Sequence, residues 1–228
     1  MVFRLSLAVV ASFALAIAVP AVAAGEEGKP AAKPVKLFNG KDLAGWGYHL
    51  SDKDVPMDEV WSVRDGVLRC TGKPSGYLVT KRDDFENYVL AVEWRWPGKG
   101  GNNGALVHVS TPGALGVWPK SLEVQLGSGD AGDFWVIGTD IDVENEADRK
   151  QDRRHLNLTD DGEKPLGQWN RMEVTCRGDE VLVKVNGTLV NHATNCSETR
   201  GAIALQSEGM PIEFRKVELR PLGTGAAE

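Results

Sequence analysis

The chain has 228 residues, enough for one sizeable hydrophobic core, and carries a formal net charge of −6 at pH 7. Binding to the phosphate backbone of a nucleic acid requires clustered lysine and arginine side chains, which this acidic chain does not offer. We therefore exclude nucleic acid as a partner.

The first residues have the pattern of a secretory signal. Arg4 supplies a positive charge, and Leu5 to Val19 form an apolar run shorter than the roughly 20 residues that a membrane span needs. Ala21 and Ala23 fit a cleavage site. We expect an exported protein, periplasmic or extracellular, with no membrane span after cleavage. The expected segments are a signal peptide over 1–23, a flexible lead-in over 24–34, one domain over 35–222 and a tail over 223–228.

Most apolar segments after the lead-in are short and end at turn residues, which is typical of β-strands. Asp65-Gly66 and Asn186-Gly187 are hairpin turn signals between such segments. No window of a dozen residues keeps the apolar stripe of a helix. The sequence therefore predicts a single-domain, all-β sandwich with strands at 61–63, 67–70, 88–96, 105–110, 122–126, 171–176, 181–185, 188–191, 202–206 and 212–219.

Alternation within these strands assigns side chains to faces. Trp94 and Trp96 fall on one side of their strand, which we expect to face the core. Leu106, His108 and Ser110 share a side of the next strand. In the strand at 122–126, Glu123 and Gln125 point the same way, and a carboxylate beside an amide on a sheet face is a candidate site.

Two further features have competing interpretations. The acidic segment 139–151 is interpreted as a solvated loop, because it lacks the mid-loop glycine and spaced glutamate of a calcium-binding EF-hand. Cys70, Cys176 and Cys196 allow one disulfide at most. Cys176 and Cys196 form the favoured pair, and three buried thiols are the alternative.

Several segments resemble, in order, the motifs of the 3-keto-disaccharide hydrolase family, formerly a domain of unknown function. The opening Leu37 to Trp46 looks like that family's "LFNGKDLxGW", and the resemblance extends from Val35 to Leu222. The other matching segments are 61–66, 93–95, 103–108, 123–125, 167–170, 186–187 and 203–209. The resemblance implies a concanavalin A-like jelly-roll sandwich with a carbohydrate site on its concave sheet.

The strand at 122–126 departs from the pattern of sandwich glycanases, which commonly place two catalytic carboxylates on one strand as E-x-D-x-E. The corresponding positions here are Glu123, Gln125 and Gly127, so the second carboxylate is missing. A ketone at C3 of the sugar would acidify the C2 proton. One base and one oxyanion stabiliser then suffice to expel the group on C1, and addition of water completes a net hydrolysis.

Candidate residues follow from this chemistry, each with a structural alternative. Catalytic candidates are Glu123, His108 and Glu208; a lone strand histidine is more often structural, and Glu208 is equally well an edge residue in water. Substrate contacts are expected from two tryptophans, whose alternative role is in the core, and from an asparagine in a glycine-containing loop. They are also expected from polar side chains whose alternative role is in surface contacts such as ion pairs. These residues are Gln125, Asn103, Arg95, Lys120, Trp118, Trp135 and Gln206.

The sequence thus predicts an exported hydrolase that cleaves glycosidic bonds of 3-keto sugars, with a carbohydrate as its partner. A carbohydrate-binding module without chemistry is the main alternative, and a structural or adhesive domain is the third. No cofactor is required by this interpretation. A divalent cation beside Glu123 and the order of acid and base are left open.

Overall fold

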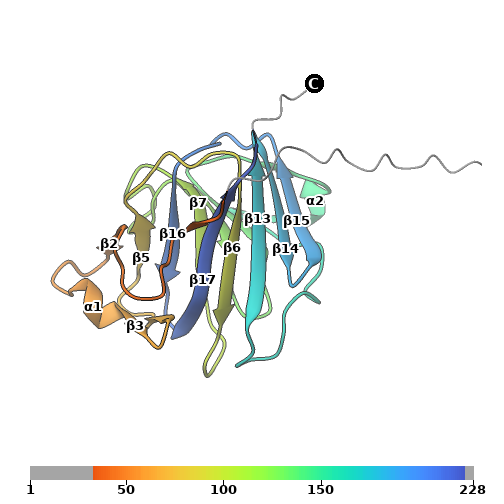
Figure 1. The fold of residues 1–228 in the computed structure, drawn as a ribbon. Helices are drawn as coiled ribbons and strands as arrows, with labels where there is room; N and C mark the ends of the chain where they lie inside the picture. Colours follow the sequence, from red (N-terminus) through yellow and green to blue (C-terminus); the bar gives the residue numbers. More distant parts are fainter. Residues whose placement is uncertain (1–32, 224–228) are drawn as a thin grey trace, which may run out of the picture.

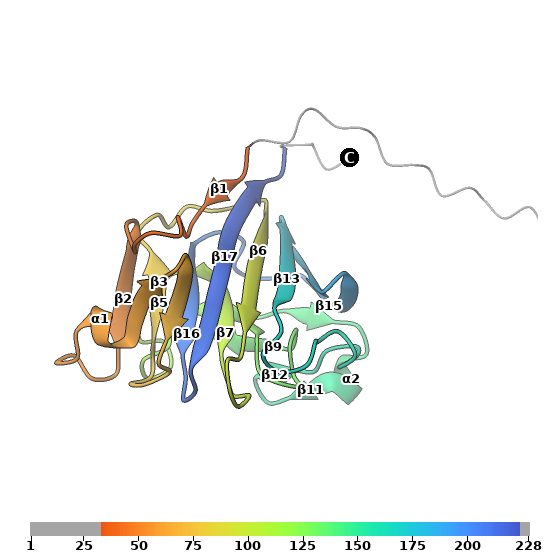
Figure 2. The same ribbon diagram turned by 60° about the horizontal axis from the view of Figure 1, so that its bottom comes forward.

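The structure is a computed structural model that describes residues 33–223. Two antiparallel β-sheets pack face to face, as Figures 1 and 2 show, and together they span Val35 to Pro221. The all-β sandwich confirms the fold class predicted from the sequence. The predicted signal peptide lies outside the described residues.

The first sheet has nine strands in the order β10-β15-β14-β13-β6-β17-β4-β3, with β1 paired to β17. Antiparallel pairing throughout allows short hairpin connections between neighbours. Its strands are β1 (Val35–Lys36), β3 (Trp61–Arg64), β4 (Val67–Cys70), β6 (Tyr88–Arg95), β10 (Asp142–Val143), β13 (Asn170–Arg177), β14 (Glu180–Val185), β15 (Thr188–Thr194) and β17 (Ile212–Pro221).

The second sheet has eight strands in the order β11-β12-β9-β8-β7-β16-β5-β2. This order places β8, which carries Glu123, near the middle of the sheet, between β7 and β9. Its strands are β2 (Trp46–Leu50), β5 (Gly76–Thr80), β7 (Gly104–Val109), β8 (Ser121–Gln125), β9 (Phe134–Ile137), β11 (Lys150–Gln151), β12 (Arg154–His155) and β16 (Ala202–Ser207).

The turn signals and the indole positions behave as predicted. Both residues of Asp65-Gly66 and of Asn186-Gly187 have positive φ, the backbone geometry of the tight hairpin turns that connect β3 to β4 and β14 to β15. Trp94 and Trp96 are 0% and 2% exposed in the core between the sheets. A run of alternating residues was therefore sufficient to identify the inner face of β6.

The segment 139–151 is not the plain solvated loop that its charge suggests. It contains β10, the helix α2 (Glu146–Arg149) and β11, and Arg149 is only 8% exposed. The Arg149 guanidinium donates hydrogen bonds to the carbonyl oxygens of Glu144 and Leu156 and to Oδ1 of Asn191, which satisfies its buried donors. An arginine thus anchors an otherwise acidic segment.

Other differences concern short elements and the cysteines. The unpredicted strands are β1, β2, β5, β9, β10, β11 and β12, of which β1, β10, β11 and β12 have only two residues each and are too short to show an alternating pattern. The helix α1 (Met57–Val60) and α2 have four residues each, and neither helix of residues 33–223 is long enough to span a membrane. The three cysteines are free buried thiols, so the favoured Cys176–Cys196 bridge is absent.

A second, smaller apolar cluster lies on the outer face of the eight-stranded sheet, the side turned away from the other sheet. We call it the apolar strip. Its position follows from alternation, since its members on β5, β7 and β16 are separated by residues that face the core. It consists of Tyr77, Val79, Leu106, Val109, Trp118, Ala202 and Ala204.

Candidate active site

Strand β8 divides its side chains between the core and the outer face as the sequence predicts. Leu122 and Val124 are buried between the sheets, whereas Glu123 and Gln125 point to the other side. Pairing with the neighbouring strands sets Glu123 opposite Leu106 of β7 and Trp135 of β9. The carboxyl group is therefore placed on a sheet surface between an apolar and an aromatic neighbour.

Glu123 lies in a cavity of about 210 Å³, here called the polar pocket. It collects side chains from β8, from β9 and the segment before β12, from the end of β16 and from two loops. Six of the predicted site residues meet there: Glu123, Gln125, Glu208, Gln206, Trp118 and Trp135. The remaining lining residues are Asn102, Ile137 and Arg153, which the sequence analysis missed.

The two carboxyl groups of the polar pocket lie in different environments. Glu123 is 6% exposed, and its pKa is raised to about 8. Burial is the main cause and the charge of the neighbouring Glu208 adds to it, whereas a hydrogen bond from Gln206 and the charge of Arg153 act to lower the pKa. Burial also raises the pKa of Glu208, which is less buried than Glu123. A hydrogen bond from Asn102 opposes this rise in pKa. At neutral pH Glu123 is therefore mostly protonated, and Glu208 is the better candidate for an ionised base.

Arg153 supplies the positive charge of the pocket. Its guanidinium lies 5.4 Å from the centroid of the Trp135 ring and forms no salt bridge with another residue of the range 33–223. The adjacent Arg154, by contrast, is paired with Asp130 and Asp133. Sequence reasoning missed Arg153 because its place beside β9 depends on the pairing of β9 with β12.

Two polar groups of the pocket have no protein partner among the described residues. They are the Oε1 atom of Gln206 and the Nε1 atom of Trp135, both buried. One accepts and the other donates a hydrogen bond, and buried groups of this kind normally have a partner. Hydroxyl groups of a sugar would satisfy both.

The Gln125 side chain lies beside Gly127, the position of the missing second carboxylate. Its Oε1 atom accepts hydrogen bonds of 3.1 Å from the backbone N–H groups of Leu126 and Gly127. A Cβ atom at Gly127 would lie 3.2–3.4 Å from the Gln125 side chain, so a carboxylate at position 127 would require Gln125 to shift by a few tenths of an ångström. The Gln125 amide nitrogen stays free to donate to a ligand.

His108 does not join the polar pocket, and the prediction that it shares a face with Leu106 is wrong. The register between β7 and β16 shifts near this residue, and His108 has a positive φ of 55°. This bulge turns its ring towards the core, where it lies edge-on to Tyr88 with ring centroids 5.9 Å apart. Burial lowers the pKa of His108 to about 4.

Three other predicted contacts also lie outside the pocket. Arg95 belongs to β6 in the other sheet, where it pairs with Glu213 and stacks on Trp169. Lys120 forms a salt bridge with Glu198. Asn103 is fully buried and donates a 2.6 Å hydrogen bond to the carbonyl oxygen of Gln206, so it supports the pocket from behind while its neighbour Asn102 lines it.

No group of three or more His, Cys, Asp or Glu side chains in residues 33–223 is arranged to hold a metal ion. Within the polar pocket, the positive charge of Arg153 opposes a cation between Glu123 and Glu208.

Known structures share this fold at low sequence identity. Two candidate glycosyl hydrolases from Parabacteroides distasonis ATCC 8503 are each 23% identical, with TM-scores of 0.60 and 0.61; they cover 84% and 83% of this chain, and the matches span 100% and 94% of their own chains. The κ-carrageenase of Pseudoalteromonas carrageenovora is 15% identical with a TM-score of 0.56, covering 86% of this chain and 97% of its own. These likenesses confirm the jelly-roll sandwich.

The sequence itself matches one family over most of its length. Residues 33–220 match the family described as a 3-keto-alpha-glucoside-1,2-lyase-like domain. No curated protein matches the chain. The matched range covers both sheets except Pro221, the last residue of β17, and includes every residue of the polar pocket. The chain therefore belongs to the family of 3-keto-alpha-glucoside-1,2-lyase-like domains, the carbohydrate-active family that its opening and closing motifs had indicated.

Proposed function

We propose that this protein cleaves glycosides that carry a ketone at C3 of the reacting sugar ring, first by elimination across C1 and C2 and then by hydration. The observation that carries the proposal is the arrangement of one buried, protonated carboxyl group, a second carboxyl group and an unpaired guanidinium around one small cavity. A base and an oxyanion stabiliser carry out the elimination, and an acid further assists the departing group by giving it a proton.

The base is assigned to Glu208. Its carboxylate takes the proton from C2, whose acidity comes from the adjacent C3 ketone, and the electron pair of the C2–H bond moves to form an enolate. Arg153 stabilises the negative charge on the former ketone oxygen, because its guanidinium has no carboxylate partner in the described chain. Gln125, Gln206 and the Trp135 indole N–H orient the hydroxyl groups of the ring.

The acid is assigned to Glu123. When the enolate electrons return, the ketone re-forms, a double bond forms between C1 and C2, and the C1–O bond breaks. The departing alcohol takes the proton of the Glu123 carboxyl group, which its pKa near 8 keeps in place at neutral pH. Water then adds across C1=C2 to give the 3-keto sugar, so that elimination and hydration together amount to hydrolysis.

The experiment compares a 3-keto-disaccharide with its unoxidised parent, each with hydrogen or deuterium at C2. We expect cleavage of the keto form alone, with a primary kinetic isotope effect from the C2 position. Equal cleavage of both sugars without a C2 isotope effect would overturn the proposal. Saturable binding of both sugars with no product from either would instead assign the domain as a carbohydrate-binding module.

A further inference from the structure

The Arg153 side chain reaches the polar pocket from a very short hairpin at the edge of the eight-stranded sheet. Arg153 lies in the two-residue turn between β11 and β12, after Asp152, whose φ is 57°. The two strands have two residues each, and the Arg153 guanidinium makes a long hydrogen bond of 3.5 Å to the carbonyl oxygen of Val136. An isolated hairpin is only marginally stable, so contacts elsewhere in the protein must fix the direction of Arg153.

The carboxylate of Asp133, the residue before β9, joins this hairpin to the rest of the sheet. Its Oδ2 atom accepts a 2.6 Å hydrogen bond from Nε of Arg154 and forms a salt bridge with Nη2 of the same guanidinium. Its Oδ1 atom accepts a 2.6 Å hydrogen bond from the backbone N–H of Asn157. Asp133 is 1% exposed, and both of its oxygens thus bind β12 or the segment that follows it. Hydrogen bonds that involve ionised groups are the strong ones in proteins.

Asp133 is itself held by the strand that carries the acid. Its backbone carbonyl oxygen accepts a 2.9 Å hydrogen bond from the N–H group of Gln125, the last residue of β8. Glu123 lies two residues earlier on the same strand. The backbone of Asp133 is therefore fixed relative to Glu123, and its side chain is fixed relative to the hairpin of Arg153.

Two consecutive arginines lie against the ring of Trp135, which lines the polar pocket. The Cζ atoms of Arg153 and Arg154 are 5.4 Å and 5.8 Å from the ring centroid, and Arg154 is the register partner of Trp135. The Asp133 carboxylate neutralises the charge of Arg154. The charge of Arg153 is left for the polar pocket, since it forms no salt bridge within residues 33–223.

Asp133 and Arg154 act from outside the polar pocket. Both line a neighbouring cavity of about 250 Å³, and neither lines the polar pocket itself. The Arg154 side chain is 24% exposed, so without the Asp133 carboxylate a partly buried charge would lose its buried partner. Movement of Arg154 towards water would relieve that cost, and it would draw the hairpin and Arg153 away from β9.

We propose that Asp133 is a positioning residue for Arg153: by binding Arg154, it holds the β11–β12 hairpin on β9 and keeps the Arg153 guanidinium in the polar pocket. The proposal rests on the function given above, in which Arg153 stabilises the enolate. Asp130 also contacts Arg154, at 2.8 Å from Nη2, but its side chain is 50% exposed. Exposed ion pairs contribute little, so this role belongs to Asp133 alone of the two.

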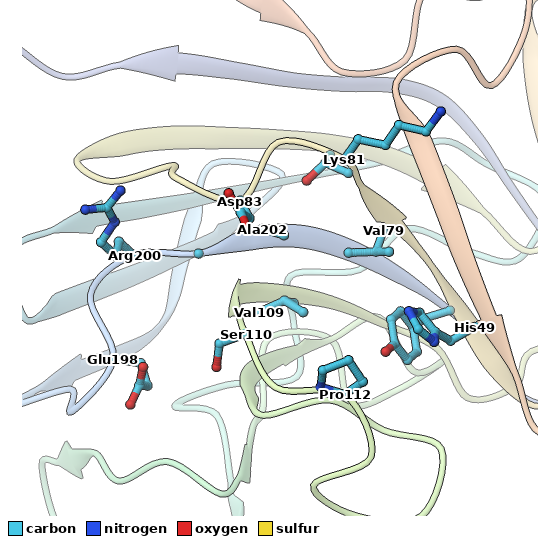
Figure 3. Close-up of a pocket in the computed structure, with 13 residues that line it drawn as sticks. His49, Val79, Lys81, Asp83, Val109, Ser110, Pro112, Glu198, Arg200 and Ala202 are labelled. Carbon is cyan, nitrogen blue, oxygen red and sulfur yellow. The ribbon is translucent and has the colours of Figure 1, made fainter.

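Kinetics with a 3-keto-disaccharide test the role of the carboxylate. Asp133→Asn keeps the size of the side chain and is expected to lower kcat by about 10- to 100-fold with little change in KM, because Arg153 is misplaced. Asp130→Asn is the matched control, since it removes the other carboxylate that contacts Arg154, and it should leave kcat within about twofold of wild type. Asp83→Asn controls for the loss of one negative charge, in a separate cavity of about 400 Å³ at the β2–β5 edge that Figure 3 shows. A wild-type kcat in Asp133→Asn, with or without a lower melting temperature, would overturn the proposal.

The double variant Asp133→Asn/Arg154→Met separates positioning from charge and stability. It removes both members of the ion pair, so it leaves no unpaired buried charge, the net charge is unchanged and we expect the fold to be kept. Because the charge of Arg153 lowers the pKa of Glu123, displacement of Arg153 should raise the midpoint of the Glu123 titration above that of wild type. Carbon-13 nuclear magnetic resonance of the Glu123 carboxyl carbon, assigned by its loss in Glu123→Gln, measures this midpoint without turnover.

The two measurements distinguish failure of this inference from failure of the proposed function. A raised Glu123 midpoint in the double variant supports the positioning role even when wild type does not turn over the keto sugar, a result that would count against the proposed function alone. An unchanged midpoint in the double variant, together with wild-type kcat in both Asp133 variants, overturns the positioning role and leaves the proposed function intact.

Discussion

The carboxyl group of Glu123 lies against the bare backbone of Gly104 on the neighbouring strand: a Cβ atom at Gly104 would come within 2.5 Å of the Glu123 Oε1 atom. Gly104 is the register partner of Gln125. The space that a side chain at Gly104 would fill therefore lies beside both Gln125 and Glu123. The absence of a side chain on β7 thus creates the space in which the acid is buried.

Substitution of Gly104 tests this relationship directly. Gly104→Ala is expected to displace the Glu123 carboxyl group and to lower kcat/KM for a 3-keto-glycoside by about 100-fold, the typical cost of misplacing a reacting group by about 1 Å. Gly47→Ala on β2 is the matched control, since its Cβ atom would meet nothing closer than 3.9 Å. Equal activity of the two variants would show that the contact does not position Glu123.

The stability of the protein should depend on pH through Glu123. Its pKa is about 8 in the folded state against 4.5 for an ordinary glutamate. Between pH 4.5 and pH 8, Glu123 is therefore protonated in the folded chain and ionised in the unfolded chain. Stability is full below about pH 4.5 and falls as the pH rises through 8. Glu123→Gln removes this loss and is expected to stabilise the fold at pH 9 by roughly 2–4 kcal/mol, while abolishing turnover.

Denaturant unfolding of Glu123→Gln and wild type at pH 5 and pH 9 measures the difference. The exposed residue Glu59 provides the control variant, Glu59→Gln, which should leave the pH profile unchanged. A stabilisation by Glu123→Gln that is the same at both pH values would contradict the raised pKa.

Removal of the Arg153 charge should affect the rate more than binding. Arg153→Met is expected to lower kcat by about 100- to 1,000-fold with little change in KM, because the guanidinium acts on charge that develops only in the transition state. Arg153 also lowers the pKa of Glu123, so the alkaline limb of the residual activity should move to higher pH. Arg64→Met, at an exposed position of β3, is the control. A rise in KM with unchanged kcat would assign Arg153 to ground-state binding.

His108 should be dispensable for catalysis. His108→Asn keeps a residue that tolerates the positive φ of 55° and removes the imidazole, and we expect kcat/KM to stay within about threefold of wild type. Because burial lowers the pKa of His108 to about 4, the wild type also loses stability as the pH falls from 6.5 towards 4, and the variant should lose less. A large loss of kcat with an unchanged melting temperature would return His108 to the mechanism.

The local sequence pattern was enough to predict features that depend on a single strand or a single turn. The two-residue alternation at 122–126 gave the outward direction of Glu123 and Gln125, and Asp-Gly and Asn-Gly gave two hairpins, because both signals depend only on neighbouring residues. Gln206 and Glu208 were found in the same way. For His108 the same rule failed, since one bulge reverses the direction of every later side chain in a strand.

The sequence by itself determined the all-β architecture, the family and six of the nine residues that line the polar pocket. Only the tertiary structure decided that Arg153 belongs to the pocket and that Arg95 does not, because strand order brings β12 beside β9 and places β6 in the opposite sheet. It also decided which carboxyl group is protonated. Burial of Glu123 results from contacts with β7, β9 and β16, and the cost of charge in that space is a property of the assembled sheet rather than of any segment.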